Sequence, residues 1–207
     1  MNEMSPDAQA AETRAKICRH ALDLFSHYGF QKTNIGDIAA RCKMSPGNLY
    51  RFFKNKQSIG IAVVRGYFDR METAMDLALM QAGDSPETRI RIFIETGVAH
   101  LVDELERTPK IVELAEFLCE DADGLAMLEE HIRWKRKRVA REIRRGIASG
   151  HFNRLDPEPT ASAVLNALKA FWMPMTLVNW VDRTTIMPEL CSILDVMFAG
   201  LAVQKTD

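Results

Sequence analysis

The sequence is poor in cysteine, and its four cysteines are far apart. Cys18, Cys42, Cys119 and Cys191 contain no Cys-x-x-Cys spacing, so neither a zinc site nor a disulfide framework is predicted. We therefore expect no bound metal and no cofactor. Each thiol is expected to be a small buried apolar group, and a redox-sensing thiol is the alternative.

Strand patterns and catalytic motifs are also missing. No segment alternates apolar and polar residues over a useful length, so we expect an all-α fold. The sequence contains no G-x-G-x-x-G, G-x-S-x-G, H-E-x-x-H or Walker motif, and its 5 histidines are scattered. An enzyme is therefore not expected.

Two further absences concern location. No apolar run approaches the ~20 residues needed to cross a bilayer. Residues 1–10 are polar and lack the apolar core of a signal peptide. We expect a cytoplasmic protein without a membrane partner, in which residues 1–10 form a flexible tail.

The chain has almost no net charge, but its charges are unevenly distributed. The net charge of the 207 residues is −1. Residues 1–56 hold nine Lys and Arg against five Asp and Glu, whereas the remainder holds 18 against 23. A basic head on an acidic body is expected of a module that reads DNA.

The most informative stretch is 33–56, which reads as two short helices joined by a tight turn. Asn34 can cap the first helix, with Asp37 three residues later completing a capping box. Ser45 can cap the second helix, with Pro46 at the first position, where a missing N–H costs nothing. This pattern predicts a helix-turn-helix.

The outward side of this pair suits a DNA duplex. Gly47 lets the backbone approach a phosphate, and the amide of Asn48 offers a donor and an acceptor to a base edge. Tyr50 and Lys56 suit phosphate oxygens. A helical hairpin with a solvated polar face is the alternative. The predicted DNA-binding set is Thr33, Asn34, Ser45, Pro46, Gly47, Asn48, Tyr50, Arg51, Lys54 and Lys56.

From Ile17 to about Ile59 the chain resembles the DNA-binding domain of the tetracycline-repressor (TetR) family. Gly36 and Phe52 depart from the pattern, since many members have a DNA-contacting Arg or Lys at the first position and a phosphate-contacting His at the second. The matching residues are Ile17, Ala21, Leu24, Phe25, Gly29, Phe30, Thr33, Ile35, Ile38, Ala39, Ser45, Gly47, Leu49, Tyr50, Phe53, Lys54 and Lys56.

The resemblance implies a ligand-responsive, homodimeric repressor that binds a palindromic operator on double-stranded DNA. It implies an N-terminal three-helix domain at 11–56 and a ligand-binding and dimerisation domain at 57–207, with about nine helices in total. A helix at 55–81 would connect the two domains. Apolar helices at 159–181 and 187–203 would form the dimer interface. The alternative function is a helical adaptor that acts through protein partners.

A pocket for a small, partly apolar effector is predicted in the C-terminal bundle. Phe93 and His100 flank the core stripe of their helix, and Pro174 predicts a kink beside Trp172 and Met175. Ordinary core packing is the alternative. The proposed lining residues are Met71, Met75, Phe93, His100, Phe117, Trp172 and Met175.

The helix predicted at 125–149 carries the most charge. Arg136 interrupts its apolar line, so it is expected either to bind an anionic ligand or to pair with Glu116 or Glu120. The basic run from Arg133 to Arg145 could be a second DNA-contacting surface, but a solvated face that pairs with nearby acids is the favoured interpretation.

Overall fold

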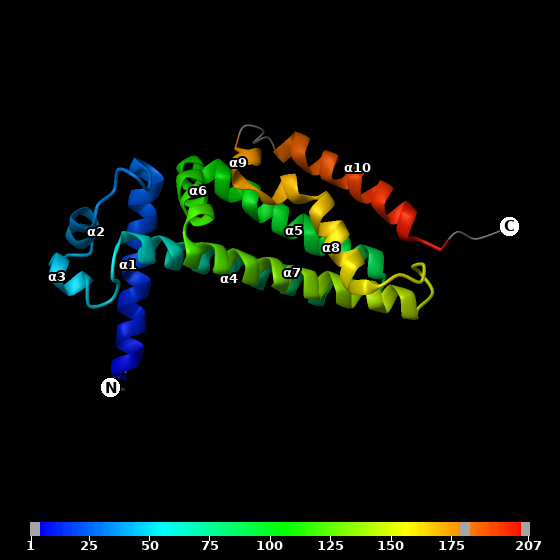
Figure 1. Cartoon of the computed structure of the whole chain (residues 1–207), viewed down its shortest axis with the longest axis horizontal. Coiled ribbons are helices and arrows are strands. Elements are labelled where there is room, and N and C mark those ends of the chain that lie inside the picture. Colours follow the sequence, from blue (N-terminus) through cyan, green and yellow to red (C-terminus); the bar gives the residue numbers. More distant parts are fainter. Residues whose placement is uncertain (1–4, 179–182, 204–207) are drawn as a thin grey trace. The chain divides into compact units, whose positions relative to one another are not determined.

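The computed structural model describes residues 5–178 and 183–203, which contain ten α-helices, two 3-10 helices and one isolated β-bridge (Figure 1). This confirms the all-α fold. The elements are α1 (Pro6–Tyr28), α2 (Ile35–Arg41), α3 (Pro46–Leu49), α4 (Lys56–Gln81), α5 (Pro86–Arg107), η1 (Pro109–Ile111), α6 (Val112–Glu120), α7 (Ala122–Ala148), α8 (Pro157–Ala167), η2 (Lys169–Trp172), α9 (Pro174–Leu177) and α10 (Arg183–Leu201).

The chain forms two compact units. The first comprises Met1–Phe68 and Thr108–Leu125, and the second comprises Asp69–Arg107 and Ala126–Asp207. The sequence suggested a boundary at residue 56, with everything beyond it in one domain. Contacts group η1 and α6 with the N-terminal helices instead, because Phe117 of α6 stacks on Phe30 at 4.8 Å between ring centroids.

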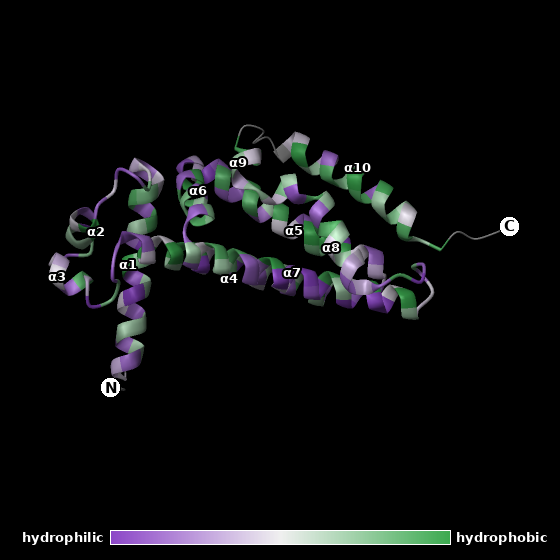
Figure 2. Cartoon of the chain, in the orientation of Figure 1, coloured by the Kyte–Doolittle hydropathy of each residue, from purple (hydrophilic) through white to green (hydrophobic). Residues whose placement is uncertain are grey.

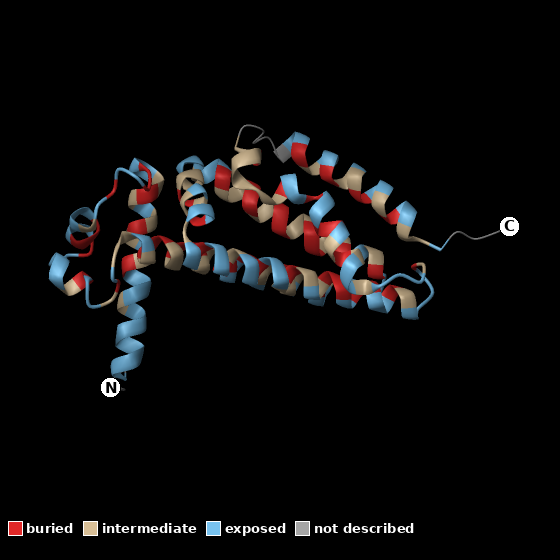
Figure 3. Ribbon diagram, in the orientation of Figure 1, coloured by how far each residue is buried: buried red, intermediate tan, exposed pale blue. Residues whose placement is uncertain are grey.

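The first unit has a small, closely packed core. The side chains of Ile17, Phe25, Ile38 and Leu49, which come from α1, α2 and α3, are completely buried. Phe30 meets Phe25 edge-on at 5.1 Å. Along these helices the buried positions are separated by intermediate and exposed ones, as expected of helices that bury one side (Figure 3).

Helix α1 begins earlier than predicted, so residues 5–10 are not a tail. Ser5 is its N-cap, and its Oγ accepts a hydrogen bond from the backbone N–H of Ala8 at 3.3 Å. Pro6 occupies the first helical position, which tolerates the missing N–H. These exposed residues lack the apolar periodicity from which a helix is predicted. Residues 1–4 of the predicted tail lie outside the described range.

Helix α5 lies at the centre of the second unit, beside α10 (Figure 1). It buries apolar side chains along its whole length, among them Ile90, Ile94 and Val98. Arg91 of α5 pairs with Asp195 of α10 at 2.6 Å, and its guanidinium lies 5.0 Å from the ring centroid of Phe198. The two helices are therefore held by both apolar and charged contacts.

The buried face of α7 differs from the prediction. Ile132, which helical periodicity places on the same line as Arg136, is 51% exposed. The inward positions include three polar side chains, His131, Lys135 and Glu142, which are 3%, 5% and 1% exposed. Figure 2 shows how many hydrophilic residues this helix carries. Its buried side is polar because neighbouring helices supply charged and aromatic partners.

The helix predicted at 159–181 is broken into α8, η2 and α9. Pro174 starts α9 rather than kinking a continuous helix. Met173 before it is extended, with φ −104° and ψ 113°, as expected because a proline ring disfavours helical backbone in the preceding residue. Residues 179–181 of the prediction, including Trp180, lie outside the described range.

Helix α10 contradicts the expectation that no segment is long and apolar enough to cross a bilayer. Its window Thr184–Leu201 is long and apolar enough to cross a membrane, with a mean hydropathy of 1.4, and 22% of it is buried. One such helix is weak support for a membrane span, because interface helices of non-membrane proteins have the same composition. Val196, which is 76% exposed, marks the face left uncovered.

Candidate nucleic-acid interface and ligand site

The first helix of the predicted pair is capped as expected. Asn34 Oδ1 accepts a hydrogen bond from the backbone N–H of Asp37, and Asp37 Oδ2 accepts one from the backbone N–H of Asn34, both at 3.0 Å. This reciprocal capping box fixes the start of α2. Asn34 therefore uses its side-chain oxygen within the fold and keeps its amide N–H groups at the surface.

The turn and the start of α3 also follow the prediction. Lys43 adopts a left-handed backbone, with φ 57°, which turns the chain sharply between α2 and α3. Ser45 Oγ then accepts a hydrogen bond from the backbone N–H of Asn48 at 3.2 Å, and Pro46 stands at the first helical position. The regular α-helix is short, ending at Leu49, and the chain continues in turns to Phe53.

Most of the predicted DNA-facing residues lie at the start of α3, within it or just after it, in the first unit. Ser45, Pro46, Gly47 and Arg51 are exposed, Tyr50 is 53% exposed and Asn48 is half-buried. Lys54 is exposed and lies 3.8 Å from Asp123 in a surface ion pair. Such a pair is weak in water, so it leaves the ammonium accessible to a phosphate.

Two predicted contact residues are occupied within the fold. Thr33 is 3% exposed, and its hydroxyl donates to the carbonyl of Gly29 at 2.9 Å. The ammonium of Lys56 donates to the carbonyl of Phe30 at 2.8 Å and lies 4.5 Å from the centroid of that ring. Burial lowers the pKa of Lys56 below its usual value. These side chains hold the loop before α2 rather than forming a free outer surface.

Two side chains that the sequence did not single out hold the irregular segments before α2 and after α3. Arg14 of α1 donates a hydrogen bond to the carbonyl of Phe52, and its guanidinium lies 4.0 Å above the ring of Phe53. Glu113 of α6 accepts a hydrogen bond from the backbone N–H of Gln31 at 3.2 Å. Neither contact could have been found from helical periodicity, because both join side chains to irregular backbone distant in sequence.

The predicted ligand residues fall in both units. Phe117 belongs to the first unit, where it packs on Phe30, and the others belong to the second.

A core group of the predicted pocket residues does meet in the second unit. Trp172 of η2 lies against Gly97 of α5, where an added Cβ would be 2.6 Å from the indole ring and 2.9 Å from Met75 Cε. Phe93 lies 5.5 Å from Trp134 between ring centroids. Met71, Met75 and Phe93 are buried, whereas Met175 lies on α9, which packs on α5.

His100, the polar residue of α5 that was predicted to line the pocket, is half-buried. Burial lowers the pKa of His100 below its usual value, so its neutral form is favoured near pH 7. His100 follows Gly97 by three residues and therefore lies on the same side of the helix.

Two polar side chains beside Trp134 and Trp172 were not predicted from the sequence. Lys135 of α7 is 5% exposed, and its ammonium lies 3.9 Å from the ring centroid of Trp172. Burial lowers the pKa of Lys135 to about 7. His131, one turn earlier, lies 2.7 Å from Glu72 through its Nδ1 and stacks on Trp134 at 5.9 Å. In the sequence, burial of Lys135 could have been inferred from its place within an apolar helix pattern. A solvated lysine is far more common than a buried one, so the pattern alone does not predict it.

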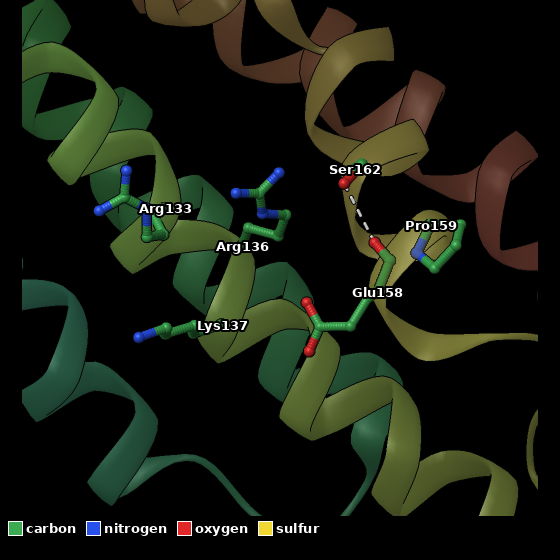
Figure 4. A pocket seen from close by; sticks show the side chains of 6 residues that line it. All are labelled: Arg133, Arg136, Lys137, Glu158, Pro159 and Ser162. Atoms are coloured by element: carbon green, nitrogen blue, oxygen red, sulfur yellow. Dashed lines mark hydrogen bonds between the residues drawn. The ribbon is translucent and has the colours of Figure 1, made fainter.

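Arg136 lies away from these residues, at the surface of the second unit. It lines a shallow hollow of about 520 Å³ between α7 and α8 (Figure 4). Glu116 and Glu120, its suggested partners, belong to the first unit. The other residues that line the hollow are Arg133, Lys137, Glu158, Pro159 and Ser162.

Much of the basic run on α7 is paired within the second unit. Arg138 binds Asp76 through two hydrogen bonds of 2.9 and 2.7 Å. Arg144 lies 3.7 Å from Glu158, and Arg145 lies 3.5 Å from Glu142. These pairs support a solvated, charge-paired face over a second DNA-contacting surface.

Comparison with known families agrees with this architecture. Residues 17–63 match the family described as bacterial regulatory proteins, tetR family, and residues 86–188 match the tetracyclin repressor-like C-terminal domain. These two regions together cover most of the chain. The protein belongs to the TetR family, and it is accordingly a DNA-binding transcriptional regulator rather than an enzyme.

Individual relatives share either the N-terminal region or the whole fold. Over 80 residues, 39% of this chain and 27% of the relative, the chain is 34% identical to the uncharacterized HTH-type transcriptional regulator YuxN of Bacillus subtilis. Over 199 residues, 94% of this chain and 84% of the relative, it is 22% identical to the HTH-type transcriptional repressor KstR of Rhodococcus jostii. The chain thus spans about a quarter of YuxN but most of KstR.

Solved structures give the same fold assignment. The SmeT–triclosan complex matches with a TM-score of 0.70 and 22% identity, covering 94% of this chain and 93% of SmeT. At this identity, the likeness shows a shared fold.

Proposed function

We propose that the protein is a homodimeric repressor that binds a palindromic operator and is released when a small, partly apolar ligand binds the second unit. The observation that carries the DNA-binding part is the geometry of α3. Its N-terminus is fixed by Ser45 and Pro46, and the adjacent side chains of Tyr50 and Arg51 are exposed. A repressor that acts on DNA would work in the cytoplasm.

The contact residues divide into two groups under this proposal. Asn48 would read a base edge, and Tyr50, Arg51 and Lys54 would hold phosphates, with the backbone at Ser45, Pro46 and Gly47 close to the duplex. Thr33, Asn34 and Lys56 would act as a frame, because their polar groups hold the loop and the start of α2.

Salt dependence separates a phosphate contact from a frame residue. Arg51→Ala should lower the slope of log affinity against log salt by about one unit, since one phosphate contact is lost. Lys56→Ala should keep the slope and lower the thermal midpoint, because its hydrogen bonds to Phe30 and Gln31 disappear. Fluorescence anisotropy with the DNA upstream of the protein's own gene measures both slopes.

A reversed result would revise the assignment. If Lys56→Ala lowered the slope without changing the thermal midpoint, Lys56 would be a phosphate contact, as the sequence alone suggested. If the unmodified protein bound operator and unrelated DNA equally, the repressor function would be wrong and an adaptor role would be favoured.

The uncovered faces of α8 and α10 support the dimeric part of the proposal. Ser192, Val196 and Ala199 of α10 are exposed and lie at helical spacing, as are Ala163 and Ala167 of α8. Small residues allow a second copy to approach closely, and a symmetric four-helix interface would cover both helices.

Val196→Glu should convert the dimer into a monomer, because two carboxylates would be buried in a symmetric interface. The matched control is Leu77→Glu, since Leu77 is also an exposed apolar residue, at 50% exposure, on another helix. Sedimentation velocity at micromolar concentration should find dimers for the wild type and the control. A dimeric Val196→Glu variant would place the interface elsewhere.

Ligand release requires only that the ligand prefers one of two states. Helix α4 contributes Lys56–Phe68 to the first unit and Asp69–Gln81 to the second. A ligand that binds the second unit better in the state with low operator affinity would shift the population, with a coupling of typically ~1–3 kcal/mol.

A further inference from the structure

We infer that the effector of the second unit is an anion, a small and largely apolar molecule with one carboxylate, bound by the ammonium of Lys135 and the indole N–H of Trp172. The inference rests on the ligand response proposed above and specifies its chemistry. It follows because the buried hydrogen-bond donors of Lys135 and Trp172 outnumber the acceptors available to them among the described residues.

Lys135 is the first of these donors. Its side chain enters the bundle from α7 and is 5% exposed, and its ammonium lies over the face of Trp172 at 3.9 Å from the ring centroid. An ammonium interacts much more weakly with a ring face than with a carboxylate, because the ring provides a quadrupole rather than a full charge. The cation is therefore available for a stronger partner.

Trp172 provides the second donor. Its Nε1 is buried, and the described part of the chain gives it no hydrogen-bond acceptor. An indole N–H in the interior usually has a partner. The same side chain thus contacts the ammonium through its ring and carries an N–H that lacks an acceptor.

The carboxylate that acts on Lys135 is already engaged, because Glu72 lies 2.7 Å from Nδ1 of His131. Glu72 also acts on Lys135 at longer range, where its charge opposes the effect of burial. An incoming acceptor is therefore needed to complete the hydrogen bonding of Lys135 and Trp172.

The surroundings determine the rest of the ligand. Met75 and Phe93 are buried apolar neighbours, and the absence of a side chain at Gly97 lets the ring of Trp172 lie against α5. An apolar body suits these walls, whereas a dianion would require a second buried cation. A single carboxylate on a hydrocarbon or aromatic body satisfies both conditions.

Matched acids and amides test the inference on the full-length protein. Octanoate and 4-phenylbutyrate are compared with octanamide and 4-phenylbutanamide by isothermal titration calorimetry. At least one acid should bind the wild type about tenfold or more tightly than its amide, as expected when a charge-assisted hydrogen bond is lost. Equal binding of acid and amide, or no binding of either acid at millimolar concentration, would overturn the inference.

Three variants locate the charge. Lys135→Met should bind acid and amide equally, and Trp172→Phe, which keeps a ring but removes the N–H, should weaken acid binding several-fold. Lys169→Met is the control, because Lys169 is an exposed lysine of η2 close in sequence to Trp172. Retained preference for the acid in Lys135→Met, or its loss in Lys169→Met, would contradict the assignment.

Proton uptake gives a second readout. Because the pKa of Lys135 is about 7, a carboxylate bound above that pH should recharge the amine and draw a proton from the buffer. Calorimetry in buffers of different ionisation enthalpy should detect this uptake in the wild type and not in Lys135→Met. Absence of uptake in the wild type would count against the ion pair.

Operator binding measured on the same samples separates the two levels of proposal. Intact operator binding without acid binding would reject only the carboxylate effector. Acid binding through Lys135 in a protein that does not bind DNA would reject the repressor function and leave the anion site standing.

Discussion

Glu142→Ala should lower the free energy of unfolding of the second unit by about 3–5 kcal/mol, the range found when one partner of a buried ion pair is removed. The side chain of Glu142 is 2% exposed, and it lies 2.7 Å from Arg89, whose side chain is 12% exposed. Arg89 also donates to the carbonyls of Leu79 and Ala82 at 2.9 and 3.3 Å. The pair therefore joins α7 to α5 and to the end of α4.

The double variant Arg89→Met with Glu142→Met is the control for this effect. It removes both charges and keeps apolar volume, so it should recover much of the stability lost in Glu142→Ala. Urea unfolding followed by tryptophan fluorescence reports on the second unit, whose sequence range contains all three tryptophans of the chain. A loss below about 1 kcal/mol for Glu142→Ala would mean that the pair behaves as a surface ion pair.

Lys135→Met should have the opposite effect and stabilise the second unit by about 2–4 kcal/mol near pH 6, since it removes a buried charge. Burial lowers the pKa of Lys135 from 10.5 to about 7. Below about pH 7 the lysine is charged in both the folded and unfolded states, and the cost of burying that charge is present in full.

The pH dependence of this difference identifies its cause. Between about pH 7 and 10.5 the unfolded state binds more protons at Lys135 than the folded state, so the stability of the wild type should rise with pH by linkage. The methionine variant lacks this contribution. The difference between the two proteins should therefore shrink from pH 6 to pH 9.5 in urea unfolding. A constant difference would trace the gain to packing alone.

The part of the structure that the sequence predicted well depends on local signals. The capping box of Asn34 and Asp37 and the cap at Ser45 involve atoms within three residues of each other. Their geometry is determined by short-range backbone chemistry, which the residue types reveal directly. The expected helix-turn-helix was found at the expected residues for this reason.

The buried face of α7 could not be predicted from the same kind of pattern. Helical periodicity predicts that apolar residues point inward. Ile132 is the apolar residue of its helical turn, yet His131 and Lys135 are the buried ones. Their burial depends on Glu72, Trp134 and Trp172, which come from three different elements. Only the packed bundle brings these partners together, so the candidate anion site became visible with the structure.

The short segments η2 and α9 show a limit of another kind. Pro174 signalled a disturbance, but a kinked helix and a new helix beginning at Pro174 are both compatible with a missing N–H. The extended backbone of Met173 decides for the new helix. Packing of η2 and α9 on α5 stabilises this choice, and it places Trp172 in the position from which the ligand chemistry was inferred.

The placement of α6 in the first unit has a consequence for the order of folding during synthesis. Domains fold as their residues leave the ribosome, yet Leu114 and Phe117 are made long after Gly60 and Phe30, the residues beside which they pack. The first unit, which carries α2 and α3, is therefore completed only after α5, the central helix of the second unit, has been synthesised. Until then the nascent chain leaves the apolar ring of Phe30 without the stacked partner that it has in the native protein.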